Sequence, residues 1–215
     1  MTNAIEHIYS NADGPAAFAR GYIAHLCKTL ASLDVDAVAD FIELLLHARE
    51  AGRTIFFLGN GGSAATSSHF ANDIGIGTRS CGKPFRAISL TDNVAVMTAI
   101  ANDYSYEDVF VMQLKYQLRP DDIVVGISAS GNSPNVIKAI AYANEAGAHT
   151  VGLTGFDGGR LRELVHTSLH VPTGKNEYGP VEDVHMVLDH LVGGFLAQAC
   201  RAETEADTAA GAAGL

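Results

Sequence analysis

Five short apolar runs, separated by stretches with helical periodicity, constrain the fold of this chain more than any other feature. The runs are TIFFLG, FRAISL, DIVVGIS, HTVGLTG and TSLHVP, at residues 54–59, 85–90, 122–128, 149–155 and 167–172. Runs of this length and composition are typical of strands that are buried on both faces of a parallel sheet. Because parallel strands are joined by crossover helices, the alternation predicts βαβ units and an α/β fold.

Helical periodicity fills the segments between and around these runs. Residues 15–31 and 35–51 carry apolar residues at helical spacing, and together they predict a helical hairpin near the start of the chain. Its apolar surface is more than one sheet can cover, so we expect the hairpin to pack against another subunit. The other predicted helices cover residues 63–74, 93–117 with a break near Asp103, 135–146, 160–165 and a long last helix from Pro180 to about Ala202.

We interpret the chain as one domain over residues 1–204, followed by a short tail. Within this domain, N-terminal helices occupy residues 1–52, and the α/β core with the last helix occupies residues 53–204. Residues 205–215 are mostly small or acidic, and we expect them to be disordered. A length of 215 residues fits a single core. The expected architecture is a three-layer αβα sandwich with a five-stranded parallel sheet.

The charge of the chain narrows its possible partners. Lys and Arg number 14 against 24 Asp and Glu, which gives a formal net charge of -10. Because an acidic surface repels phosphate backbones, we expect no nucleic-acid partner. No apolar stretch is long enough for a membrane span, and the first residues lack the pattern of a signal peptide, so we expect a cytoplasmic protein without a membrane partner. Three widely spaced cysteines predict no disulfide framework.

Two loops that follow predicted strands have an unusual composition. GNGGSAATSSHF at residues 59–70 and SASGNSPN at residues 128–135 supply glycines and small hydroxyl residues, and each leads into a helix. Such loops bind phosphate through backbone N–H groups, serine hydroxyls and the helix N-terminus. Neither loop contains lysine or matches a nucleotide-binding motif, so they predict a small phosphorylated ligand. The alternative is that both are ordinary glycine and serine connections.

Four polar residues on two predicted helices form a candidate metal site. His69 and Asp73 are four residues apart, which puts both side chains on one helix face. Glu182 and His190 are eight residues apart on the last helix, which separates them by about 80° around its axis. Two imidazoles and two carboxylates suit a divalent ion, with zinc the most natural and nickel or iron as alternatives. His185 is within reach of Glu182, either as a partner of the site or as a packing residue.

Three segments make the chain similar to a known family. LGNGGSA, IANDYSYEDVF and GISASGNSPNVIKAI resemble the sugar isomerase (SIS) domain family, and within it the phosphoheptose isomerases. The resemblance covers nearly the whole chain and implies a flavodoxin-like SIS fold. It also implies an aldose–ketose isomerase that converts sedoheptulose 7-phosphate to D-glycero-D-manno-heptose 7-phosphate through an enediolate, for heptose-containing surface glycans. The resemblance further implies a homotetramer with active sites at the subunit interfaces.

The resemblance also implies roles for individual positions. It places phosphate contacts at Ser128, Ala129, Ser130 and Ser133, and sugar contacts at Asn60, Gly61, Gly62, Ser63, Asn102 and Asp103. The corresponding metal positions in the family are His, Glu, Gln and His, and they bind zinc in some members. This sequence has His69 and His190, but Asp73 replaces the glutamate and Glu182 replaces the glutamine. We therefore expect catalytic proton transfer from Asp73 or Glu182, acting with His190.

Two other interpretations stay open. Some SIS proteins with similar loops bind replication-initiator proteins and lack the catalytic residues, and the departures at positions 73 and 182 are compatible with such a role. The same departures are compatible with an isomerase that acts on another ketose phosphate. The retained His69 and His190 favour an enzyme over a non-catalytic binding protein.

Overall fold

A five-stranded parallel sheet forms the centre of the computed structural model, which describes residues 3–213 and the side chains of residues 3–206. The strand order is β2-β1-β3-β4-β5, and all four pairings are parallel. The strands are β1 (Thr54–Gly59), β2 (Arg86–Ser89), β3 (Ile123–Ser128), β4 (His149–Thr154) and β5 (Thr167–His170). The predicted α/β class with five parallel strands is confirmed, and each strand lies within two residues of its predicted bounds.

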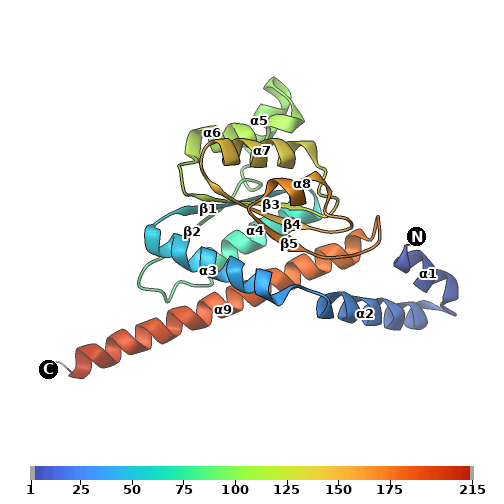
Figure 1. The fold of residues 1–215 in the computed structure, drawn as a ribbon, viewed down its shortest axis with the longest axis horizontal. Coiled ribbons are helices and arrows are strands. Elements are labelled where there is room, and N and C mark those ends of the chain that lie inside the picture. Colours follow the sequence, from blue (N-terminus) through green and yellow to red (C-terminus); the bar gives the residue numbers. More distant parts are fainter. Residues whose placement is uncertain (1–2, 214–215) are drawn as a thin grey trace.

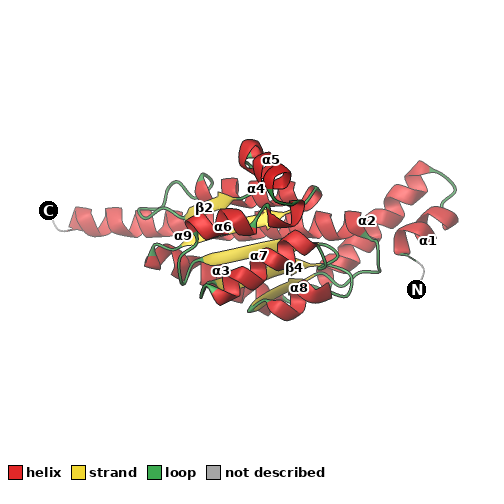
Figure 2. Ribbon diagram, turned by 90° about the horizontal axis from the view of Figure 1, so that it is seen from above, coloured by secondary structure: helices red, strands yellow, loops and turns green. Residues whose placement is uncertain are grey.

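Helices cover both faces of this sheet and complete three layers (Figure 1, Figure 2). One face is covered by α3 (Val35–Ala51), α4 (Gly62–Gly75) and α9 (Tyr178–Ala213). The other face is covered by α5 (Val94–Asp103), α6 (Val111–Gln117), α7 (Pro134–Glu145) and α8 (Gly159–Leu164), with a 3₁₀ turn, η1 (Tyr106–Asp108), after α5. The break expected near Asp103 is therefore the end of α5.

Alternate residues of the central strands supply the two halves of the core. In β1, Ile55 and Phe57 pack with α3, α4 and α9, whereas Phe56 and Leu58 pack with the helices of the opposite face. Because helices cover both faces, every residue of β1 is buried. This is the physical reason that the strand is continuously apolar in sequence instead of alternating.

The start of the chain differs from the predicted hairpin. A helix that was not predicted, α1 (Ala4–Asn11), precedes α2 (Pro15–Ala31) and packs on it, with the rings of Tyr9 and Phe18 6.2 Å apart. The next helix, α3, packs on the sheet, while α2 extends away from it, so these two helices follow one another along the molecule (Figure 1). The hairpin therefore consists of α1 and α2, and Thr29 is the one buried residue of α2.

The last helix is longer than predicted. It begins at Tyr178, two residues before the predicted start, and continues to Ala213. It therefore includes most of the segment 205–215, for which we expected a disordered tail. Alanine and glutamate in this segment have high helix propensity, which favours continuation of the helix. Residues 214–215 lie outside the described residues.

A disulfide joins α9 to the loop after α4, contrary to the expectation from cysteine spacing. It links Cys81 and Cys200, which are 119 residues apart in the chain. Arg49 of α3 lies beside this bond, with Nη1 3.0 Å from Cys81 Sγ, and its Nη2 forms an ion pair of 2.7 Å with Glu203 of α9. Spacing could not reveal the bond because packing between distant helices brings the two thiols together.

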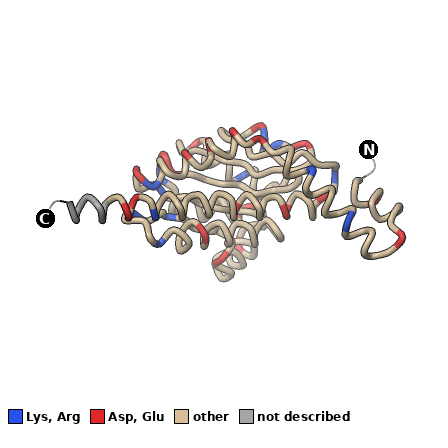
Figure 3. The backbone as a smooth tube through the Cα atoms, turned by 90° about the horizontal axis from the view of Figure 1, so that it is seen from below, with Lys and Arg blue, Asp and Glu red and all other residues tan. Residues whose placement is uncertain are grey.

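Charged residues are spread over the outer elements of the fold. Figure 3 shows Lys and Arg interspersed with Asp and Glu along the backbone. Within the part of the chain that the structure describes, no helix has both the length and the apolar content needed to cross a membrane.

Candidate functional site

Two of the loops selected from the sequence meet at the carboxyl edge of the sheet. Strands β1 and β3 are neighbours, so the loops that follow them, residues 59–62 and 128–133, lie side by side. Asn60 in the first loop and Asn135 in the first turn of α7, directly after the second loop, form two reciprocal side-chain hydrogen bonds, each 2.9 Å long. Strand order thus brings the two loops to the edge where α/β proteins bind their ligands.

The serine loop, defined as residues 128–133, is held in shape by its own polar groups. The hydroxyl oxygens of Ser128 and Ser133 lie 3.2 Å apart at hydrogen-bond distance. Ser130 Oγ accepts a hydrogen bond of 3.3 Å from the backbone N–H of Asn132. The loop leads directly into the N-terminus of α7, whose first residue, Pro134, has no N–H and whose Val136 N–H donates a hydrogen bond of 3.0 Å to Asn135 Oδ1.

Glycine is required at the tip of the serine loop. Gly131 has a φ of 64°, and a Cβ atom there would lie 1.9 Å from the carbonyl oxygen of Gly158. The carbonyl oxygen of Gly131 also accepts a hydrogen bond of 2.8 Å from the N–H of Leu161. The loop after β3 is therefore fixed against the loop after β4. The buried Ala129 has no hydroxyl, so its polar contacts come from the backbone alone.

Glu182 of α9 lies against the first turn of α4. A Cβ atom built on Gly62 would lie 2.3 Å from Glu182 Oε2, so glycine leaves room for this carboxylate. Gly61 has a φ of 54° and Ser63 is buried, which turns the chain sharply from β1 into α4. Burial raises the pKa of Glu182, and the neighbouring Asp183 raises it further. Such a carboxylate is suited to bind sugar hydroxyls or to exchange protons.

Four polar side chains meet between α4 and α9, and we name them the donor group. The donor group consists of His69 and Asp73 of α4 and Asp189 and His190 of α9, whose ligand atoms all lie within 4.8 Å of one another. The Nε2 atoms of the two histidines are 3.3 Å apart. His69 Nε2 also lies 3.5 Å from Asp73 Oδ2 and 3.7 Å from Asp189 Oδ2.

Asp189 is the least ordinary member of the donor group. Its side chain has no exposed area, and neither carboxylate oxygen has a hydrogen-bond partner among the described residues. Burial raises the pKa of Asp189 to about 7, and the charge of Asp73 adds to this effect. A buried carboxylate without a partner is unfavourable unless a cation compensates its charge. With two imidazoles and a second carboxylate beside it, the donor group fits a divalent metal ion.

Three of the four predicted metal ligands belong to the donor group, and Glu182 does not. Although Glu182 and His190 share a broad face of α9, eight residues correspond to a rise of about 12 Å along a helix. The carboxylate of Glu182 instead faces Gly62. Asp189 lies on the same helix and was not predicted from the sequence, and it is the fourth member of the donor group.

The segment IANDYSYEDVF contacts the first loop through a residue that was not selected from the sequence. Asn102 and Asp103, the predicted sugar contacts, are exposed at the end of α5 and hydrogen-bond to each other at 2.9 Å. Tyr106 of η1 contacts the first loop instead, because its hydroxyl donates a hydrogen bond of 2.9 Å to Asn60 Oδ1. A tyrosine within a segment that carries the family resemblance was the available signal for this contact.

Comparison with known proteins decides the family. A family model described as "SIS domain" matches residues 20–155, which include both loops. This chain belongs to the SIS-domain family. Among its relatives in that family, a phosphoheptose isomerase from Akkermansia muciniphila is 39% identical over 79% of this chain and 88% of the relative. Another, from Geobacter sulfurreducens, is 40% identical over 71% of this chain and 82% of the relative.

Solved structures of SIS-domain proteins agree with the fold. The phosphoheptose isomerase from Neisseria gonorrhoeae aligns with a TM-score of 0.75 and 30% identity, over 84% of this chain and 97% of that chain. A phosphoheptose isomerase from Francisella tularensis aligns with a TM-score of 0.77 at 24% identity, which supports the fold alone. The expected SIS fold and the resemblance to phosphoheptose isomerases are therefore confirmed.

Proposed function

We propose that this SIS-domain chain is a phosphoheptose isomerase, an aldose–ketose isomerase. Its reaction converts sedoheptulose 7-phosphate to D-glycero-D-manno-heptose 7-phosphate, for the synthesis of heptose-containing surface glycans. The observation that carries the proposal is the donor group on α4 and α9, where α4 follows one of two loops of phosphate-binding composition. Relatives that are named phosphoheptose isomerase and align over most of this chain support it. The fold alone would not support this proposal, because proteins with the same fold have many different functions.

The serine loop binds the phosphate of the substrate. Ser128, Ser130 and Ser133 supply hydroxyl groups, and Ala129 supplies its backbone N–H. These contacts are nearly the same in the ground state and the transition state. They therefore lower KM more than they raise kcat.

The sugar extends from the serine loop along α4 toward the donor group. Residues at the first loop then face its hydroxyl groups, and Glu182 accepts hydrogen bonds from them. We assign these sugar contacts to Asn60, Gly61, Gly62, Ser63 and Glu182, with Asn102 and Asp103 as contacts from the end of α5.

The donor group holds a divalent metal ion, which we propose to be zinc. Its nitrogen and carboxylate ligands would come from His69, Asp73, Asp189 and His190, a set that zinc prefers. When bound, the ion polarises the neighbouring carbonyl and hydroxyl oxygens of the open-chain sugar. The buried charge of Asp189 makes the strongest argument for a cation at this position.

Asp73 is the residue that we assign as the base. It removes a proton from carbon 1 of the ketose and returns it to carbon 2 of the enediolate, while the hydroxyl proton on oxygen 1 is transferred to oxygen 2. Asp73 has 27% of its side chain exposed and Asp189 has none, so Asp73 is the carboxylate of the donor group that substrate can contact. His190, which is exposed, donates a hydrogen bond to the oxygen that gains charge. Glu182 is the alternative base because its pKa is raised.

We further propose a homotetramer with active sites at the subunit interfaces. Val187, Leu191 and Phe195 are exposed apolar residues at helical spacing on α9, and they flank His190. A second copy that covers this stripe would also shield the donor group from water. Sedimentation equilibrium is expected to show four chains per particle, and a fully active monomer would contradict this part of the proposal.

The isomerase proposal is tested by NMR of the reaction in deuterated water. With zinc restored after chelation, we expect turnover of sedoheptulose 7-phosphate and deuterium at the carbon that receives the proton. Ketose phosphates with five and six carbons are tested in the same way. Faster turnover of one of these would identify it as the substrate, and the proposed aldose–ketose isomerisation would still hold. Absence of turnover, exchange and zinc binding with every sugar would favour a non-catalytic binding protein.

A further inference from the structure

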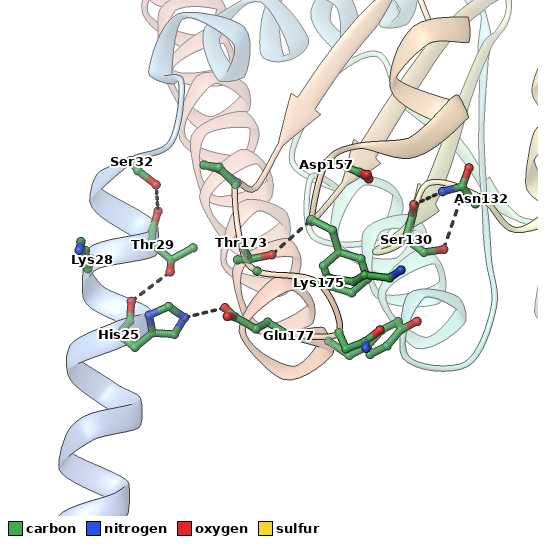
Figure 4. Close-up of a pocket in the computed structure, with 15 residues that line it drawn as sticks. His25, Lys28, Thr29, Ser32, Ser130, Asn132, Asp157, Thr173, Lys175 and Glu177 are labelled. Carbon is green, nitrogen blue, oxygen red and sulfur yellow. Dashed lines mark hydrogen bonds and ion pairs between the residues drawn. The ribbon is translucent and has the colours of Figure 1, made fainter. Parts of the chain in front are cut away.

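Two residues of α2 hold the segment that leads into α9. His25 Nε2 lies 2.9 Å from Glu177 Oε2, a contact that Figure 4 shows between α2 and the loop after β5. Three residues earlier on α2, the hydroxyl of Tyr22 donates a hydrogen bond of 2.5 Å to Asp183 Oδ2. Both contacts join residues that are more than 150 positions apart in the chain. Together they fix the start of α9 against α2.

The first turn of α9 is shaped to receive Tyr22. A Cβ atom on Gly179 would lie 3.0 Å from the hydroxyl oxygen of Tyr22, so glycine leaves room for the phenol. Burial raises the pKa of Tyr22, and the hydrogen bond to Asp183 and the charges of Asp183 and Glu182 raise it further. The phenol therefore keeps its proton and stays a hydrogen-bond donor over the whole pH range in which carboxyl groups titrate.

Glu182, next to Asp183, has no such hydrogen bond of its own. Its carboxylate faces Gly62 at the first turn of α4, and it accepts no hydrogen bond from any described residue. The acceptor capacity of this carboxylate is therefore free for a ligand. Its position depends on how the start of α9 is placed, and Tyr22 and His25 determine that placement from α2.

The groups around Glu182 determine how easily it ionises. Burial raises the pKa of Glu182, and the charge of Asp183 on the same helix adds to this effect. From α2 it faces the neutral phenol of Tyr22, and from α4 it faces Gly62, which carries no charge. A carboxylate that accepts a hydrogen bond repels a neighbouring carboxylate less than a free one does. The hydrogen bond from Tyr22 thus limits the effect of Asp183 on Glu182.

We infer that Tyr22 is a positioning residue for Glu182, whose carboxylate it keeps aimed at the sugar by holding Asp183 and the start of α9. The inference rests on the proposed function, in which Glu182 accepts hydrogen bonds from sugar hydroxyls. An ionised carboxylate accepts through both oxygens, whereas a protonated carboxyl group donates through one of them. Because Tyr22 limits the repulsion from Asp183, it extends the binding of the sugar to lower pH.

The first test follows the ionisation of Glu182 in the full-length protein by carbon NMR of labelled glutamate carboxyl groups, with Glu182→Gln to assign the signal. Tyr22→Phe keeps the aromatic ring and removes the donor, so the pKa of Glu182 is expected to rise by about 0.5 to 1. Asp183→Asn, added to Tyr22→Phe, removes the repelling charge and is expected to reverse this rise. Tyr116→Phe makes the same change on the exposed face of α6 and is expected to have no effect.

The second test measures sugar binding without turnover, by calorimetric titration with the seven-carbon polyol phosphate obtained by reduction of sedoheptulose 7-phosphate. At about pH 6, Tyr22→Phe is expected to weaken binding by about three- to tenfold, and the added Asp183→Asn should recover most of the loss. An unchanged titration of Glu182 in Tyr22→Phe would overturn the inference. So would a loss of binding that the double variant does not recover, because Tyr22 would then only support the fold. The expected shift and recovery in a protein without isomerase activity would support the inference and contradict only the proposed reaction.

Discussion

The donor group and the serine loop differ in how their polar atoms are satisfied. In the donor group, both carboxylate oxygens of Asp189 lack a hydrogen-bond partner among the described residues, and two imidazole nitrogens face each other at 3.3 Å. In the serine loop, Ser128 pairs with Ser133, and Ser130 accepts from Asn132. The first region needs a cation to compensate its charge, whereas the second exchanges internal hydrogen bonds for those of a ligand.

Because of this difference, the two regions should respond to substitution in different ways. The donor group concentrates charge that the folded protein alone does not neutralise, so its variants change kcat, metal affinity and the stability of the metal-free protein. The serine loop is organised before a ligand arrives, so its variants change KM and leave stability nearly unaltered.

Asp73→Asn is expected to lower kcat by about a thousandfold, because an amide cannot accept the proton from carbon 1. The reaction is followed by NMR with saturating zinc and sedoheptulose 7-phosphate. Glu145→Gln, which makes the same chemical change at an exposed position of α7, serves as the control and is expected to keep full activity. If Glu182→Gln abolished turnover while Asp73→Asn retained it, the base would be Glu182 instead.

The pH dependence of stability separates two buried groups of α9. Burial lowers the pKa of His185 to about 4, so the stability that depends on its neutral form is present above pH 6.5 and is lost as the pH falls toward 4. The loss amounts to about 3 kcal/mol at ~1.4 kcal/mol per pKa unit. The raised pKa of Asp189 acts oppositely, because it lowers stability as the pH rises from about 4 to 7. In metal-free wild type the two contributions nearly cancel between pH 4 and 6.5.

Single substitutions are expected to separate the contributions of His185 and Asp189 to the pH dependence of stability. Asp189→Asn leaves the His185 effect, so the free energy of unfolding falls as the pH is lowered from 6.5 to 4. His185→Gln leaves the Asp189 effect, so the free energy of unfolding rises over the same range. Urea unfolding with a chelator present measures both, and parallel pH profiles for the wild type and the two variants would show that neither group is titrating as its burial requires.

Asp189→Asn is also expected to change metal binding and stability in opposite directions. At pH 8 the metal-free variant should gain about 2 kcal/mol of stability, because a buried and unpartnered charge is removed. Its zinc affinity should fall by about 10–100-fold, because one anionic ligand is lost. Equilibrium dialysis and urea unfolding measure the two quantities on the same protein. Unchanged zinc affinity would exclude Asp189 from the set of metal ligands.

Ser133→Ala is expected to have the smallest effect, on the serine loop. Loss of one hydroxyl contact to phosphate should raise KM by about fivefold, which corresponds to about 1 kcal/mol, with kcat unchanged. Steady-state kinetics measure both parameters, and Ser10→Ala on the exposed face of α1 is the matched control. A fall in kcat without a change in KM would remove the distinction between the two regions.

The fold and the position of the two loops at the carboxyl edge of the sheet could be predicted because their sequence signals are local. A continuous apolar run, a glycine and a helix start are readable from neighbouring residues, as in β1 and Gly61. His69 and Asp73 could be paired because they lie one turn apart on the same helix. These are properties of single elements, and tertiary packing preserves them.

The rest of the candidate site depends on contacts between elements that are far apart in sequence. The grouping of Glu182 with His190 considered the angle around α9 and not the rise along it. Asp189 could be recognised only from the packing of α4 on α9, which turns its carboxylate toward His69. The contact between His25 and Glu177 could not be predicted either, because the two residues are 152 positions apart.

The disulfide between Cys81 and Cys200 has a consequence for how the donor group is assembled. Cys81 lies in the loop after α4, eight residues beyond Asp73, and Cys200 lies on α9, ten residues beyond His190. A bond between residues that are 119 positions apart restricts the conformations of the unfolded chain. The two segments that carry the donor group therefore stay joined while the chain is unfolded, which lowers the entropy lost when they come together.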